Sequence, residues 1–132
     1  MDKNPNSKLE HQELTGKIIA AAINVHKALG PGFIESIYEN ALVLELRRCG
    51  LKVEKEVVVP IKYEGVDVGI HRLDLMVEGT IVVELKAVSN LEDIHFAVVK
   101  SYLRAVDREH GLLINFGKPT IEVKRVINRN AR

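Results

Sequence analysis

The segment HRLDLMVEGTIVVELK, residues 71–86, alternates apolar and polar side chains on both sides of a short turn at residues 78–80. Alternation with a period of two is typical of strands that bury one face, and a glycine-containing turn between two such runs predicts a β-hairpin. The apolar positions would form one face across both strands: Leu73, Leu75, Val77, Ile81, Val83 and Leu85.

The register of this hairpin follows from the chemistry of its side chains. If Val77 faces Ile81 across a three-residue loop, the two apolar faces coincide and Asp74 lies directly opposite Glu84. A two-residue loop would instead pair Asp74 with Val83 and bury a carboxylate among leucines, which is strongly disfavoured. We therefore predict that Asp74 and Glu84 are cross-strand neighbours.

Lys86 lies on the same predicted face as these two carboxylates. Adjacent carboxylates repel each other, and a divalent cation with a preference for oxygen ligands, Mg²⁺ or Mn²⁺, would offset that repulsion. The same residues also fit a solvated strand face with a cross-strand pair between Asp74 and a lysine. The spacing alone leaves both interpretations open.

Five strings in this chain resemble known motifs. Asp74, a hairpin turn and Glu84-Leu85-Lys86 resemble the PD-(D/E)xK signature of restriction-endonuclease-like nucleases, and residues 32–38, GFIESIY, resemble the string that names the GxxExxY protein family. Residues 26–32, 38–42 and 111–117 are similar to further parts of that family, in the same order. The resemblance runs from about residue 14 to residue 127.

The resemblance implies a set of metal ligands and a catalytic lysine. Asp74 and Glu84 would hold Mg²⁺ or Mn²⁺ together with Glu35 and the backbone carbonyl of Leu85. Lys86 would position the attacking water and stabilise negative charge in the transition state. Glu35 also has a simpler interpretation, because an acidic residue in the first turn of a helix interacts favourably with the helix dipole.

Four further residues are implied to bind substrate or support the site: Tyr102, His26, Tyr38 and His95. Related sequences carry a glutamine one turn before the tyrosine of the third helix, where this chain has Val98, which has no hydrogen-bonding side chain. His95 is the nearest polar substitute. His26 has a second interpretation, in which it interacts with the last carbonyls of its own helix.

Composition predicts one soluble domain. The chain has 132 residues, 46% of them hydrophobic, and 19 basic against 18 acidic side chains, so no global field attracts it to nucleic acid. The single cysteine, Cys49, excludes an internal disulfide and a cysteine-based zinc cluster. No segment is long and apolar enough to span a membrane, and no signal peptide precedes the first helix, so we expect a cytoplasmic protein.

The order of elements predicts a restriction-endonuclease-like α/β (α+β) core, in which helices flank a mixed central sheet with an antiparallel meander. Residues 9–127 would form this single domain, between a flexible tail at 1–8 and a short basic tail at 128–132. Periodicity and breakers place helices at 9–29, 34–49 and 92–108, and strands at 52–63, 66–77, 81–86, 111–116 and 121–127.

Two classes of function remain open. The first is a Mg²⁺-dependent nuclease that hydrolyses phosphodiester bonds of DNA or RNA, with a homodimer or a protein partner left open. The second is a catalytically weakened module of the same fold that binds nucleic acid or a protein partner. Val98 and a small basic cluster (Arg47, Arg48 and Lys52) favour the second class.

Overall fold

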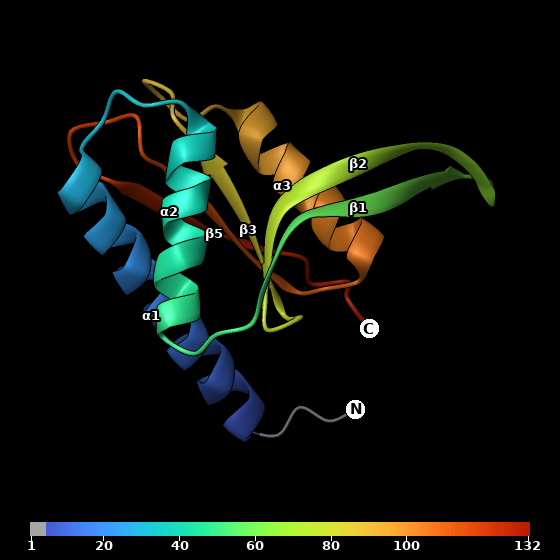
Figure 1. The fold of residues 1–132 in the computed structure, drawn as a ribbon. Coiled ribbons are helices and arrows are strands. Elements are labelled where there is room, and N and C mark those ends of the chain that lie inside the picture. The colour runs from blue at the N-terminus through green and yellow to red at the C-terminus, as the bar shows by residue number, and fades with distance from the viewer. Residues whose placement is uncertain (1–4) are drawn as a thin grey trace.

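The computed structural model describes the backbone of residues 5–132 and the side chains of residues 11–132, and consists of three helices and five strands within that range (Figure 1). In chain order these are α1 (Pro5–Leu29), α2 (Glu35–Arg48), β1 (Val53–Tyr63), β2 (Val66–Val77), β3 (Ile81–Lys86), α3 (Asp93–Val106), β4 (His110–Asn115) and β5 (Glu122–Ile127). None of the helices described is long and apolar enough to cross a membrane.

The strands form one mixed sheet in the order β1-β2-β3-β4-β5. The first three strands are an antiparallel meander, β4 runs parallel to β3, and β5 returns antiparallel to β4. The parallel pair is joined by α3, as expected for strands that need a crossover connection. The predicted mixed sheet with an antiparallel meander is therefore confirmed.

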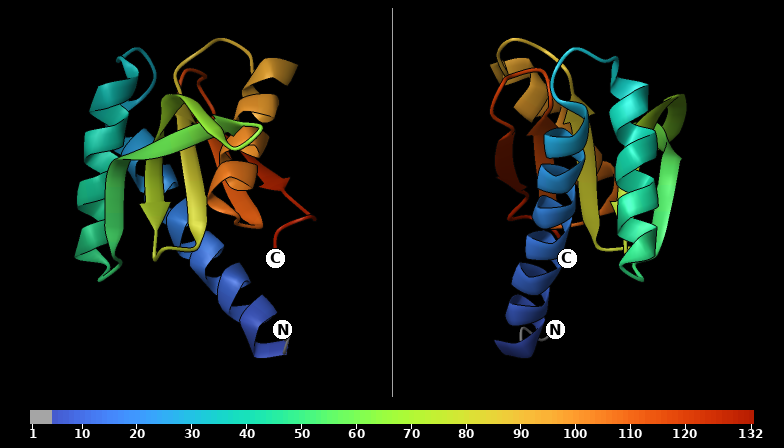
Figure 2. Two further views of the ribbon diagram at one scale, coloured as in Figure 1. Left: turned by 90° about the vertical axis from the view of Figure 1, so that its right-hand side faces the viewer. Right: turned by 60° about the vertical axis from the view of Figure 1, so that its left-hand side comes forward.

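Helices cover both faces of the sheet, with α1 and α2 on one side and α3 on the other (Figures 1 and 2). The central strand β3 is buried on both faces, because alternate residues enter two separate cores. Ile81, Val83 and Leu85 pack in the core under α1 and α2, whereas Val82 packs in the core under α3. Glu84, the acidic residue of β3, is consequently enclosed by the protein.

The observed elements begin and end close to the predicted boundaries, except at the N-terminus. The first helix begins at Pro5 and not at residue 9, so residues 5–8 of the expected tail are helical, and residues 1–4 lie outside the described part of the chain. The earlier start escaped prediction because the apolar spacing that marks this helix begins only at Leu14. At the C-terminal end of the chain, the backbone amide of Asn128 donates a hydrogen bond to the Glu109 carbonyl at 2.8 Å.

The β1–β2 hairpin extends beyond the rest of the sheet and bends toward α3 (Figure 2). Between the pairs Lys55–Leu75 and Val57–Leu73, Glu56 adopts a positive φ of 52°, which interrupts regular strand geometry. Beyond this point Leu73 packs in the core under α3 and not with Leu75. The prediction that Leu73 shares a face with Leu75, Val83 and Leu85 was therefore wrong.

Asn115 fixes the loop that follows β3. Its side-chain oxygen accepts hydrogen bonds from the amides of Val88 and Gly117, both at 3.0 Å, and its nitrogen donates to the Val88 carbonyl at 2.9 Å. Gly117 approaches this loop so closely that a Cβ there would lie 2.5 Å from the Val88 nitrogen. The end of β3, which carries Lys86, is thereby held against β4.

Replacing Asn115 with alanine should lower the free energy of unfolding by about 3 kcal/mol, because it leaves buried backbone groups of Val88 and Gly117 without partners. Urea denaturation measures this difference. As a control, Asn40→Ala removes an exposed hydrogen bond to Lys55 and should change stability by less than about 0.5 kcal/mol. Equal stability of the two variants would contradict a structural role for Asn115.

Candidate active site

Asp74 and Glu84 lie where β2 and β3 separate. The ladder between the two strands contains the pairs Val77–Ile81, Met76–Val82 and Leu75–Val83, which is the predicted register. Beyond the pair Leu75–Val83, hydrogen bonds between backbone amides and carboxylates take the place of backbone–backbone pairing. The Leu85 amide donates to Asp74 Oδ2 at 2.8 Å, and the Asp74 amide lies 3.4 Å from Glu84 Oε1. The two carboxylates are thus cross-strand neighbours, and each accepts a hydrogen bond from a backbone amide of the opposite strand.

Burial makes this pair of carboxylates electrostatically unfavourable. Glu84 is 6% exposed, and burial, followed by the charge of Asp74, raises its pKa to about 8. Burial also raises the pKa of Asp74, against the opposing effect of the hydrogen bond from the Leu85 amide. Two buried acids of this kind favour a proton or a cation between them.

Lys86 supplies the positive charge nearest in sequence to the pair. It is half-buried at the end of β3, and its charge lowers the pKa of both Asp74 and Glu84 without outweighing their burial. Because side chains alternate along a strand, Lys86 and Glu84 point to the same face of the sheet. Glu84 and Lys86 therefore share the α3 side of the sheet.

Glu35 is the third acidic metal ligand that the family resemblance implies. Glu35 is exposed at the start of α2, and its charge raises the pKa of both Asp74 and Glu84. Among the residues that the structure describes, however, no group of three or more acidic, histidine or cysteine side chains is arranged closely enough to hold a metal ion. The preformed part of the site is thus the pair Asp74 and Glu84.

Glu39 is an acidic residue near the pair that the sequence interpretation missed. It is 7% exposed, and its Oε2 atom has no hydrogen-bond partner. Burial, followed by the charges of Asp74 and Glu56, raises the pKa of Glu39 to about 7. The signal was present in the sequence, because Glu39 lies four residues after Glu35 and so on the same side of α2.

Tyr102 braces α3 against β2 next to the acids. Its hydroxyl donates to the Arg72 carbonyl at 3.2 Å, and its ring meets that of His71 edge-on at 5.6 Å. Burial, then the charges of Glu84 and Asp74, raises its pKa to about 12. One turn earlier, Val98 is half-buried and packs against the core under α3, so it adds no polar group.

Tyr38 and His26 are parts of the scaffold around the α1–α2 connection. Tyr38 is fully buried, stacks on Phe116 at 4.6 Å, and donates its hydroxyl to the Gly30 carbonyl at 2.5 Å. His26 lies 2.8 Å from the Lys118 carbonyl through Nε2, so the expected contact with its own helix end was wrong. Both side chains connect elements and are turned away from solvent.

His95 caps α3. Its Nδ1 accepts a hydrogen bond from the Glu92 amide at 2.9 Å, which forms a capping box at the start of the helix. This hydrogen bond explains the position of the half-buried His95 side chain, so a role at the carboxylate pair is not needed to explain it. The contacts of His95 therefore do not support it as a substitute for the glutamine that related sequences carry at the position of Val98.

A mixed five-stranded sheet covered by helices on both faces (Figure 1) is consistent with a restriction-endonuclease-like fold. The family model described as the PD-(D/E)XK nuclease superfamily matches residues 12–126, and the chain belongs to this superfamily. A solved structure titled "Crystal structure of SSO0001" is similar in fold, with 20% sequence identity and a TM-score of 0.54. The similarity covers 71% of this chain and 50% of that chain, so this chain spans about half the length of that protein. No curated protein matches the sequence.

Proposed function

We propose that this protein is a metal-dependent nuclease that hydrolyses phosphodiester bonds of DNA or RNA. The observation that carries the proposal is the adjacent, largely buried pair Asp74 and Glu84, with Lys86 two residues further along β3, within a PD-(D/E)XK nuclease domain. Buried acids with raised pKa values and one specific charged neighbour are typical of functional sites.

The chemistry of the donors fits a hard divalent cation. Asp74 and Glu84 offer only oxygen atoms, and the unpaired Oε2 of Glu39 is a further buried oxygen near them. Oxygen ligands of this kind suit Mg²⁺ or Mn²⁺. Such an ion would polarise the phosphate and lower the pKa of a water molecule.

Five residues of the chain would bind the cation, orient the attacking water and position the substrate. Asp74 and Glu84 would bind the cation, with the carbonyl of Leu85 as a further ligand. Lys86 would orient the attacking water and stabilise the charge that develops on the phosphate. Tyr102, which already spans α3 and β2, would keep the substrate strand in register with the acids.

Glu35 and Glu39 are alternative third acids. We expect Glu39→Gln to weaken Mn²⁺ binding and slow cleavage at least tenfold, because Glu39 is buried beside Asp74, whereas Glu35 is exposed. Isothermal titration and initial cleavage rates measure the two effects, with Glu45→Gln on the same helix as control. A larger loss in Glu35→Gln than in Glu39→Gln would assign the role to Glu35 instead.

The strings at residues 32–38 and 111–117 further support placement within the GxxExxY family. Val98 favours the second function, a nuclease-fold module that binds nucleic acid or a protein partner without cleaving it, because the side chain at this position is packed in an apolar core.

A cleavage panel separates the two functions. Single- and double-stranded DNA and RNA are incubated with Mg²⁺, with Mn²⁺ or with EDTA, beside Asp74→Ala as control. The nuclease proposal predicts cleavage of at least one substrate, dependent on metal and absent in Asp74→Ala. Binding without cleavage under every condition would establish the module.

A further inference from the structure

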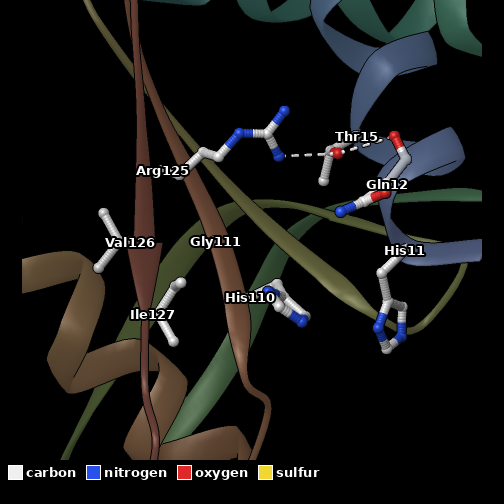
Figure 3. Close-up of a pocket in the computed structure, with 8 residues that line it drawn as sticks. All are labelled: His11, Gln12, Thr15, His110, Gly111, Arg125, Val126 and Ile127. Carbon is white, nitrogen blue, oxygen red and sulfur yellow. Dashed lines mark hydrogen bonds between the residues drawn. The ribbon is translucent and has the colours of Figure 1, made fainter. Parts of the chain in front are cut away.

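Two histidines meet where the N-terminal half of α1 lies beside the start of β4 (Figure 3). The ring centres of His11 and His110 are 4.8 Å apart, and the two rings are tilted by 57°. Both side chains line a cavity of about 410 Å³, which leaves room for an ion and its water ligands. Figure 3 shows a ring nitrogen of each histidine on the side that faces the other ring.

The separations between these side chains match those of ligands on one metal ion. Two imidazoles bound to one tetrahedral ion, with metal–nitrogen distances of about 2.0–2.1 Å, have their ring centres about 5 Å apart. Glu109 adds a carboxylate, because its Oε1 lies 3.6 Å from His110 Nε2. That distance is too long for a hydrogen bond, whereas two ligand atoms of one tetrahedral ion lie about 3.4 Å apart.

The two histidines are held in place, and the carboxylate is free to move. His11 lies on α1, and His110 is the first residue of β4. Among the described side chains, no group of three acidic, histidine or cysteine residues is already arranged as a metal site. The Glu109 side chain is 41% exposed, so a change of rotamer can bring its carboxylate closer to both rings.

The charges around His110 favour a cation. Burial lowers its pKa, and among the charged neighbours the acid Glu109 has the largest effect, which opposes that shift. The imidazole is therefore neutral at pH 7, which is the form that binds metal ions. His11 and Arg125 lower the pKa further but by less. The guanidinium of Arg125 donates to Thr15 Oγ1 at 2.9 Å, away from the two rings (Figure 3).

This cluster is separate from the pair Asp74 and Glu84. His110 pairs with Ile81 at the start of β3, whereas Glu84 lies three residues further along that strand. Neither acid of the pair lines the cavity. Imidazole nitrogens suit Zn²⁺, Cu²⁺ or Ni²⁺, whereas carboxylate oxygens suit Mg²⁺. The two clusters therefore differ in the metals that their donors favour.

We propose that His11, His110 and Glu109 bind a divalent transition metal of the Zn²⁺ class, with water at the remaining position. Two histidines, a glutamate and one open position are an established donor set for Zn²⁺. The N-terminal half of α1 extends beyond the sheet (Figure 2), and Thr15 is the first buried side chain among those described in this helix. The ion would fasten this part of α1 to β4, independently of the proposed nuclease activity.

Calorimetry with Zn²⁺ on the untagged full chain, in an excess of Mg²⁺ that competes for the carboxylate pair, tests the proposal. We expect Zn²⁺ to bind under these conditions. His11→Gln and His110→Gln should each weaken Zn²⁺ binding at least tenfold, because each removes one of three protein ligands. His71→Gln, which changes an exposed histidine on β2, is the matched control and should bind Zn²⁺ as the wild type does.

Imidazole resonances in the NMR spectrum of the wild type give a second measurement that requires no variant. Zn²⁺ should shift the signals of His11 and His110 together and leave that of His71 unchanged. The proposal is overturned by absence of Zn²⁺ binding at millimolar concentration or by wild-type affinity in either of the two variants His11→Gln and His110→Gln. A shift confined to the other histidines would also overturn it.

Discussion

Lys86→Ala should bind Mg²⁺ or Mn²⁺ with nearly wild-type affinity but lose about 10²–10³-fold in cleavage rate, the usual effect of removing one group that stabilises transition-state charge. We expect this result because Lys86 lies close enough to lower the pKa of both acids but has no side-chain oxygen with which to bind the metal. Asp74→Ala should lose both metal binding and cleavage. Initial rates and a metal titration on the same preparations measure the difference.

Lys100→Ala is the control for this experiment, because Lys100 is an exposed lysine on α3. It should cleave at the wild-type rate. Wild-type cleavage by purified Lys86→Ala would assign the activity to other residues or to a contaminant.

Glu84→Gln should stabilise the metal-free protein at high pH. The pKa of Glu84 is raised to about 8 from its ordinary value of 4.5, so the folded protein holds this proton more tightly than the unfolded chain does. The stability that this proton contributes is present in full below pH 4.5 and is lost as the pH rises toward 8. At pH 9 the variant should be more stable than the wild type by on the order of 5 kcal/mol, and near pH 4.5 the two should be alike.

Metal should reduce the difference in stability between the two proteins. Mg²⁺ or Mn²⁺ binds only the folded wild type and should stabilise it by about 2.7 kcal/mol at a hundredfold excess over Kd. The gain should shrink sharply in Glu84→Gln, and remain in Glu54→Gln, which alters an exposed strand residue. Equal melting shifts in wild type and Glu84→Gln across a full metal titration would favour the non-catalytic module.

The register of the central hairpin could be predicted because one alternative buried a charge. With Val77 opposite Ile81, apolar side chains meet apolar ones, and Asp74 and Glu84 become neighbours, as the structure shows. Leu73 escaped the same reasoning because alternation holds only along a regular strand. The positive φ of Glu56 bends the hairpin and turns Leu73 toward α3.

The surroundings of the site depend on contacts between distant segments, which local patterns do not encode. The family resemblance implied a role for Tyr38 at the site, yet Tyr38 stacks on Phe116, nearly eighty residues away in sequence. The spacing of Glu39 from Glu35 places both on the same side of α2, but only the packing of α2 brings Glu39 close enough to Asp74 for the two charges to interact. The cavity at His11 and His110 likewise forms only when α1 packs on β4.

The most direct test of the central claim is anomalous diffraction from crystals soaked in Mn²⁺. Manganese scatters anomalously at accessible wavelengths, so its position is read without reference to activity. The account predicts a peak at the carboxylates of Asp74 and Glu84, and no such peak in Asp74→Ala. A fully soaked crystal with no peak at these carboxylates, or with its peak elsewhere, would contradict the assignment of the metal site.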